Sequence, residues 1–188
     1  MADLMLAPLT ALGHVLPEQH NIGPVTLTEV IDTALGSLAI RAGREADLAA
    51  AAAAAGIPLP GPGLWAQGPL WQAFWMTPGM WMVEAPFATH EDIRRALLAI
   101  FGDTAAITEQ TDGWVRIDVT GADLPALFER LCNLDLRAAP EGAATRSVID
   151  HIGCYVIRRS ASRISVLGPR SSAAALWHAL ETTARSVF

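Results

Sequence analysis

The chain has 188 residues, a formal net charge of −6 and 13 basic residues, all of them arginine. The lack of lysine excludes a phosphate-loop lysine, a Schiff base and a lysine general base, and the acidic balance offers no electrostatic footprint for nucleic acid. The sequence shows neither a basic secretory leader nor the roughly 18 uninterrupted apolar residues of a membrane span. We therefore predict a cytoplasmic protein of one domain, or of two joined halves, with no nucleic-acid or membrane partner.

The composition is poor in charge for a chain of this size. Hydrophobic residues make up 52% and charged residues 17%, against about 25% charged in an average soluble domain. One interpretation is that part of the surface is buried against another protein, because the centres of interfaces are depleted in charge and enriched in Trp, Met and Arg. The other is the bias of a GC-rich genome, which the alanine run from Ala49 to Ala55 illustrates.

The first third of the chain predicts an arm, a strand and a helix. Residues 1–24 are rich in Pro, Gly and His and lack periodicity, so we predict an arm that lies across a partner. A strand is expected over 35–42 and a helix over 45–55, which Gly56 and Pro58 end. The sequence IPLPGPG, residues 57–63, predicts a stiff extended loop.

A hairpin follows, with strands over 71–76 and 80–84 around Thr77-Pro78-Gly79. Both faces of the first strand are largely apolar, which indicates that it is covered on both sides. The helices of the chain are one expected cover, and a partner subunit is a hypothesis for the other.

The rest of the chain repeats this alternation. Thr89 and Asp92 resemble a capping box before a helix over 93–101. Strands are expected over 105–109 and 114–119, where Val115, Ile117 and Val119 face inward and Arg116 and Asp118 face outward. A helix from 123 to 131, strands over 147–158 and 164–167, and a closing helix over 171–185 complete the pattern.

This order predicts an α+β fold of two split-βαβ (ferredoxin-like) halves, with antiparallel sheets and helices on one face of each. We place the halves at residues 25–110 and 111–188, joined into one compact unit after the arm of residues 1–24. The second half lacks an obvious last strand.

Candidate chemistry is sparse. The histidines form no HExxH, and no paired CxxC occurs. His151 and Cys154 would diverge on a strand, so a buried cysteine is the favoured interpretation over a nucleophilic pair. Asp118 is interpreted as a surface charge. Residues 168–172 could present amides to an anion, although a helix entry capped by Ser171 is favoured. We predict no catalytic, cofactor-binding or metal-binding residue.

Several motifs, in their order and spacing, resemble one family. Val25-Thr26-Leu27-Thr28-Glu29 leads to Ala34–Ala39, and Leu59-Pro60-Gly61-Pro62-Gly63 follows an alanine-rich helix. Next come Trp75–Trp81, then Cys132-Asn133-Leu134-Asp135-Leu136, and lastly Gly168-Pro169-Arg170-Ser171 with Leu176-Trp177. From about Val25 onward, this arrangement is similar to the gamma subunit of heterotetrameric sarcosine oxidase.

The resemblance implies a fold like the folate-binding domain of the glycine-cleavage aminomethyltransferase. It also implies alpha, beta and delta partner subunits in a flavoenzyme that oxidatively demethylates N-methyl amino acids. Those partners would hold NAD and tetrahydrofolate (alpha), the flavins FAD and FMN (beta) and zinc (delta), and this chain would bind no cofactor by itself. As a structural subunit, it is expected to bury a surface that contains Trp71, Trp75, Trp81, Pro60 and Pro62.

Two other functions stay open at this point. One is a stand-alone protein that binds folate or another small ligand between its halves, with the Gly168–Arg170 turn meeting an anionic group. The other is an independent cysteine enzyme that uses Cys154, which the missing aligned base disfavours.

Overall fold

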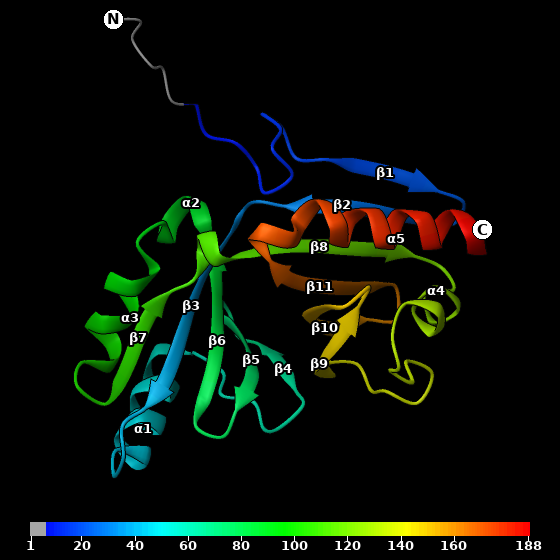
Figure 1. The fold of residues 1–188 in the computed structure, drawn as a ribbon. Coiled ribbons are helices and arrows are strands. Elements are labelled where there is room, and N and C mark those ends of the chain that lie inside the picture. Colours follow the sequence, from blue (N-terminus) through cyan, green and yellow to red (C-terminus); the bar gives the residue numbers. More distant parts are fainter. Residues whose placement is uncertain (1–6) are drawn as a thin grey trace, which may run out of the picture.

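The computed structural model describes residues 7–188, so the first six residues of the predicted arm lie outside the described part. Two antiparallel sheets form the body of the protein (Figure 1). The five-stranded sheet has the order β4 (Trp65–Gln67), β5 (Gln72–Thr77), β6 (Met80–Pro86), β3 (Thr33–Ile40), β7 (Ala105–Glu109). The six-stranded sheet has the order β1 (Gln19–Ile22), β2 (Val25–Val30), β8 (Trp114–Gly121), β11 (Arg163–Pro169), β10 (Ile152–Ser160), β9 (Ala144–Ile149).

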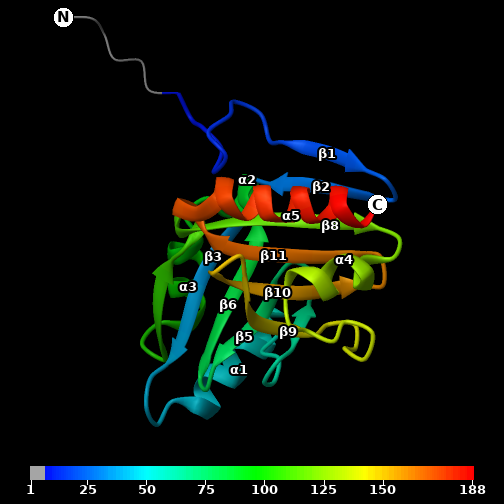
Figure 2. The same cartoon turned by 45° about the vertical axis from the view of Figure 1, so that its right-hand side comes forward.

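Each sheet carries its own helices. Helices α1 (Glu45–Ala55), α2 (Phe87–His90) and α3 (Ile93–Phe101) belong to the five-stranded sheet, and α4 (Leu124–Leu131) and α5 (Ala173–Val187) cover the six-stranded sheet (Figure 2). Short 3₁₀ turns, Thr111–Gly113 and Arg170–Ser172, precede β8 and α5. Asp92 alone caps α3, accepting a hydrogen bond from the Arg95 amide at 3.0 Å, whereas Thr89 lies in α2, so the predicted capping box does not form.

The two halves share one topology, which confirms the predicted α+β fold of split-βαβ units. The strand order β4-β5-β6-β3-β7 of the first sheet corresponds to β9-β10-β11-β8-β2 of the second. Strand β2 therefore fills the place of the last strand that the second half lacks in sequence order. The predicted assignment of residues 25–30 to the first half differs from the structure, because β2 pairs with β8 along its whole length.

Part of the predicted arm is also regular structure. Residues 19–22 form β1, which pairs with β2 as a hairpin, from Gln19 opposite Thr28 to Ile22 opposite Val25. The rest of the described arm, residues 7–18, precedes β1 and is hydrogen-bonded to Glu29 of β2 and to Arg170. Alternating burial in β2, with Val25, Leu27 and Glu29 buried, fixes this hairpin against α5.

Three apolar clusters hold the layers together. One lies between α4, α5 and the six-stranded sheet, and a second lies between α1, α3 and the five-stranded sheet. The third lies between the two sheets themselves and consists of Leu35, Phe74, Met82, Ala144, Tyr155, Ile157 and Leu167. The second cover of the tryptophan-rich hairpin is therefore the other sheet of the same chain, and the partner-subunit hypothesis for that face was wrong.

Glycine allows the close approach of a helix in each half. A Cβ atom on Gly36 of β3 would lie 2.8 Å from Leu97 of α3, and one on Gly168 of β11 would lie 2.6 Å from Leu176 of α5. Both distances are shorter than real carbon contacts, so a larger residue at either position would require the end of the facing leucine side chain to move.

Candidate functional site

A buried network of charged side chains joins the two sheets. Glu84 of β6, whose side chain is only 1% exposed, accepts hydrogen bonds from Arg159 of β10 at 2.9 and 3.0 Å. Arg116 of β8 donates to the same carboxylate at 3.4 Å. The Arg159 guanidinium also lies over the Trp65 ring, 4.7 Å from its centroid. Glu84 thus links strands of both sheets through two arginines.

Asp118 is the second carboxylate of this network. Arg116 donates to its two oxygens at 2.9 and 3.1 Å, Arg163 of β11 donates at 2.8 and 2.5 Å, and the Ser165 hydroxyl donates at 2.6 Å. Burial opposes ionisation of Asp118, but the charges and hydrogen bonds of Arg116, Ser165 and Arg163 outweigh it and lower its pKa to about 2. The carboxylate is therefore fully charged at neutral pH.

The structure corrects the outward placement predicted for Arg116 and Asp118. Both lie on the face of β8 opposite Val115 and Ile117, as the alternation indicates, but that face is covered by the five-stranded sheet and both residues are buried. Glu84 and Arg159 were not singled out from the sequence. The signal that could have found them was a strand with apolar residues on both faces and single charges in between.

Asp118 makes stability depend on acid pH. Its pKa in the folded state, about 2, lies below its ordinary value of 3.8, so its contribution is complete above about pH 4 and is lost as the pH falls toward 2. We expect roughly 2 kcal/mol of stability to disappear over this range. Urea unfolding at pH steps from 6 to 2 measures it. An Asp118→Asn variant should show a flatter pH profile, and an identical profile would contradict the assignment.

A cavity of about 300 Å³ lies under the arm, where the two sheets meet. The arm contributes one wall, and the others come from β2, β3, α2, β8 and the 3₁₀ turns, through Leu9, Val15, Ile31, Leu35, Phe87, Trp114, Arg116 and Arg170. At its rim, the Arg170 guanidinium donates to the Leu9 carbonyl at 2.9 Å and lies 3.7 Å from the Asp112 carboxylate. The lining is more apolar than polar, and its polar part includes Glu29, Asp112, Arg116 and Arg170. Apolar pockets that also present polar groups are typical of small-molecule sites.

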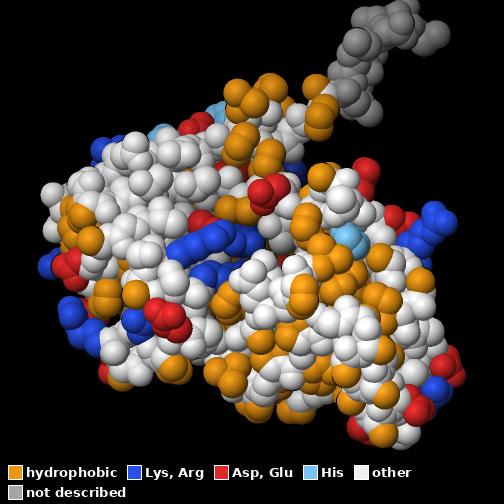
Figure 3. All heavy atoms as spheres, turned by 180° about the vertical axis from the view of Figure 1, so that it is seen from behind, with side chains coloured by type: hydrophobic (Ala, Val, Ile, Leu, Met, Phe, Trp, Pro, Cys, Tyr) orange, Lys and Arg blue, Asp and Glu red, His pale blue; other side chains and the backbone are white. Residues whose placement is uncertain are grey.

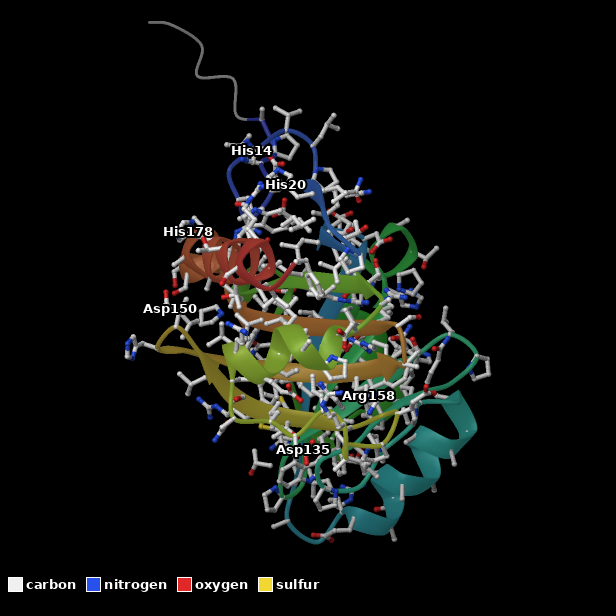
Figure 4. All side chains as sticks on the ribbon, turned by 90° about the vertical axis from the view of Figure 1, so that its right-hand side faces the viewer. His14, His20, Asp135, Asp150, Arg158 and His178 are labelled. Atoms are coloured by element: carbon white, nitrogen blue, oxygen red, sulfur yellow. The ribbon has the colours of Figure 1, made fainter. Side chains whose placement is uncertain are left out.

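Buried and surface carboxylates hold the arm in place. Glu29 of β2, which is buried, accepts hydrogen bonds from the amides of Leu12 at 3.0 Å and Glu18 at 3.3 Å. At the surface, the His20 ring lies 2.8 Å from Glu181 of α5. Figure 4 shows His20 where the chain passes over this helix, with His14 on the arm above it. The arm is therefore a fixed wall of the cavity.

The predicted interface residues occupy different environments. Trp75 and Trp81 lie opposite each other on β5 and β6, and both are half-buried. The Trp81 indole donates to the Pro60 carbonyl at 2.8 Å, and Pro62 is exposed on the same loop. Trp71 is only 5% exposed and packs in the core with its ring 4.7 Å from that of His90, so it has little surface for a partner.

The cysteine and histidine candidates do not converge. His151 is exposed in the turn between β9 and β10, whereas Cys154 is buried in the core. Burial, with a smaller contribution from Cys132, raises the pKa of the Cys154 thiol to about 12, so it is a poor nucleophile at neutral pH. Within residues 7–188, no three His, Cys, Asp or Glu side chains are grouped so that they could hold a metal ion.

The motif at Cys132–Leu136 holds a loop. Asp135 accepts hydrogen bonds from the amides of Arg137 and Ala138 at 3.0 and 3.1 Å, and Leu136 is buried. Arg158 of β10 donates to the Leu136 carbonyl at 2.7 Å; Figure 4 shows Arg158 and Asp135 at this side of the molecule. This geometry indicates a structural function for the motif.

None of the helices in residues 7–188 is long and apolar enough to cross a membrane.

Comparison with known proteins defines the fold class. No protein-family model and no curated protein matches the sequence. Among solved structures, the glycine cleavage system aminomethyltransferase T from Bartonella henselae matches 86% of this chain and 46% of its own length, with a TM-score of 0.64 and 12% identity. The chain therefore has an aminomethyltransferase-like fold.

A second likeness is more complete. A chain of the heterotetrameric sarcosine oxidase from Corynebacterium sp. U-96, solved in complex with pyrrole 2-carboxylate, matches 90% of this chain and 88% of its own length. The TM-score is 0.76 at 19% identity, a similarity that shows the fold. The match extends over nearly the whole of both chains.

Proposed function

We propose that this chain is a non-catalytic subunit, of the gamma type, in a heterotetrameric flavoenzyme like sarcosine oxidase, which oxidatively demethylates sarcosine or related N-methyl amino acids. The observation that carries the proposal is the nearly end-to-end likeness of fold and length to one chain of such an enzyme. Alpha, beta and delta subunits in the cytoplasm are its proposed partners. They would hold NAD, tetrahydrofolate, FAD, FMN and zinc, none of which this chain would bind alone.

The low charge content supports an assembly. We use the name tryptophan surface for Trp75, Trp81, Pro60 and Pro62. Both tryptophans are half-buried, the Pro60 carbonyl accepts the hydrogen bond of Trp81, and Pro62 is exposed. Aromatic residues beside a charge-poor loop are typical of interface centres. We propose that this surface contacts the alpha or beta subunit, and that Trp71 supports it from the core.

Purification of the tagged chain from its native cells tests the proposal. We expect a yellow complex with flavin absorbance, three further polypeptides and oxidase activity toward an N-methyl amino acid. A colourless, well-folded chain recovered alone would contradict the proposal.

Substitution of Trp75 tests the proposed surface. We expect Trp75→Ala to weaken assembly by about 2 kcal/mol, roughly thirtyfold in Kd, because a large aromatic anchor is lost. Analytical ultracentrifugation of the reconstituted complex measures it. Val148→Ala, at an exposed apolar residue on the edge strand β9, is the control. An equal effect of both changes would place the interface elsewhere.

The cavity under the arm supports a second candidate, a stand-alone protein that binds folate or another small ligand. Arg170 stands at the rim and Trp114 in the wall, so a ligand there would change tryptophan fluorescence. Titration of the purified chain with folates tests this function, and the absence of any heat or fluorescence change would remove it.

A further inference from the structure

The charged network reaches the surface through one of its arginines. Among residues 7–188, it consists of three arginines and two carboxylates: Arg116, Arg159 and Arg163 with Glu84 and Asp118. Buried charges are normally paired, because an unpaired charge away from water is costly. Arg116 and Arg159 are buried with the two carboxylates, whereas Arg163 shares Asp118 with Arg116 and extends toward the surface.

Arg163 lies at a groove between the sheets. This groove, of about 230 Å³, is separate from the cavity under the arm, with Thr33 and Arg116 as their common wall. Its polar lining comes from both sheets and consists of Asp32, Thr33, Gln72, Glu84, Arg116 and Arg163. Figure 3 shows the groove side of the molecule, where arginine side chains lie in the hollow between the two halves.

Arg163 is the arginine that can accept a new partner. Its Nε and Nη2 atoms donate to Asp118, while Nη1 has no hydrogen-bond partner within residues 7–188. The side chain is 47% exposed, in contrast to the buried Arg116 and Arg159. A guanidinium edge that is anchored on one side and free on the other suits a carboxylate, which accepts two parallel hydrogen bonds.

The same groove also carries a negatively charged group, Asp32. Asp32 is exposed, and apart from the Thr33 hydroxyl at 3.3 Å its carboxylate has no side-chain partner in the described residues. A simple anion would be repelled by Asp32, whereas a molecule that carries an ammonium group beside its carboxylate would satisfy both sides. The groove is smaller than the roughly 300–1,000 Å³ of drug-sized pockets, so it suits a small molecule.

We propose that the groove between the two sheets is a binding site for a small amino-acid zwitterion, whose carboxylate pairs with Arg163 and whose ammonium group lies toward Asp32. Gln72 and Thr33 add polar atoms to the wall, and Leu70 adds an apolar contact for a short side chain. The inference does not rest on the subunit proposal, because every lining residue belongs to this chain.

Calorimetric titration of the purified chain at low salt tests the site with three probes: alanine, propionate and ethylamine. Alanine carries both charged groups, and each of the others carries one. We expect alanine to bind several-fold more tightly than propionate, and ethylamine to give no measurable heat. Equal binding of alanine and ethylamine, or no binding of alanine, would overturn the proposal.

Matched variants locate the binding. Arg163→Gln is expected to weaken the binding of alanine at least tenfold. Arg137→Gln, at an exposed arginine paired with Glu129, should leave the binding of alanine unchanged. Asp32→Asn should weaken the binding of alanine and strengthen the binding of propionate, so that the difference between the two affinities disappears. Thermal melts confirm that each variant is folded. Alanine binding that survives Arg163→Gln, or an unchanged preference in Asp32→Asn, would refute the site.

Discussion

Replacement of Glu84 with alanine is expected to lower the free energy of unfolding by about 3–5 kcal/mol. The substitution removes the carboxylate that pairs with Arg159 and Arg116, both of which lie in the opposite sheet. Arg159 keeps the neutral Gln72 and Ser165 oxygens, at 3.1 and 3.0 Å, and the Trp65 ring, so its buried charge loses its negative counterpart. Urea unfolding of the purified chain, followed by tryptophan fluorescence, measures the loss.

An exposed ion pair provides the control. Glu129 binds Arg137 at 2.5 Å, and both side chains are largely exposed to water. Glu129→Ala should therefore cost at most about 1 kcal/mol. If Glu84→Ala cost no more than this control, the network would not hold the sheets together.

Replacement of Phe74 with alanine is expected to cost about 3–5 kcal/mol in the isolated chain. Phe74 is fully buried between the sheets, with its ring 4.9 Å from that of Tyr155. Removing the ring leaves a cavity that strands of two sheets cannot close, because each strand is fixed by its ladder of hydrogen bonds. Urea unfolding of the chain without any partner is the measurement.

Phe87→Ala is the matched change, since Phe87 in α2 is 36% exposed. It should alter stability by less than about 1 kcal/mol. The comparison tests the packing between the two sheets. Equal small effects in the free chain would contradict a tightly packed layer around Phe74.

Local sequence patterns predict most of the elements but not their partners in the sheets. The helix at Glu45–Ala55 and the hairpin around Pro78-Gly79 follow from alternation, propensity and turn residues. Strand β2 has equally clear alternation, yet its pairing with β8 depends on contacts far along the chain, which no local pattern encodes. The missing strand of the second half could therefore be noticed from the sequence but not located.

The charged network was hidden for a related reason. Alternation in β8 correctly separates Val115 and Ile117 from Arg116 and Asp118, but it cannot tell whether the polar face meets water or a second sheet. Tertiary contact alone decides that Arg116 pairs with Glu84. The predicted divergence of His151 and Cys154 assumed one strand over 147–158, whereas His151 lies in the turn between β9 and β10 and Cys154 lies in β10.

The pairing of β2 with a strand of the second half imposes an order on folding during synthesis. All five strands of one sheet lie between Thr33 and Glu109, so this sheet can close while the ribosome is still making the second half. The β1–β2 hairpin emerges first but must wait for β8, and its edge stays open throughout that interval. A nascent chain thus carries β2 with one edge unpaired until β8 has been made, and an open strand edge of this kind is a template for pairing with another chain.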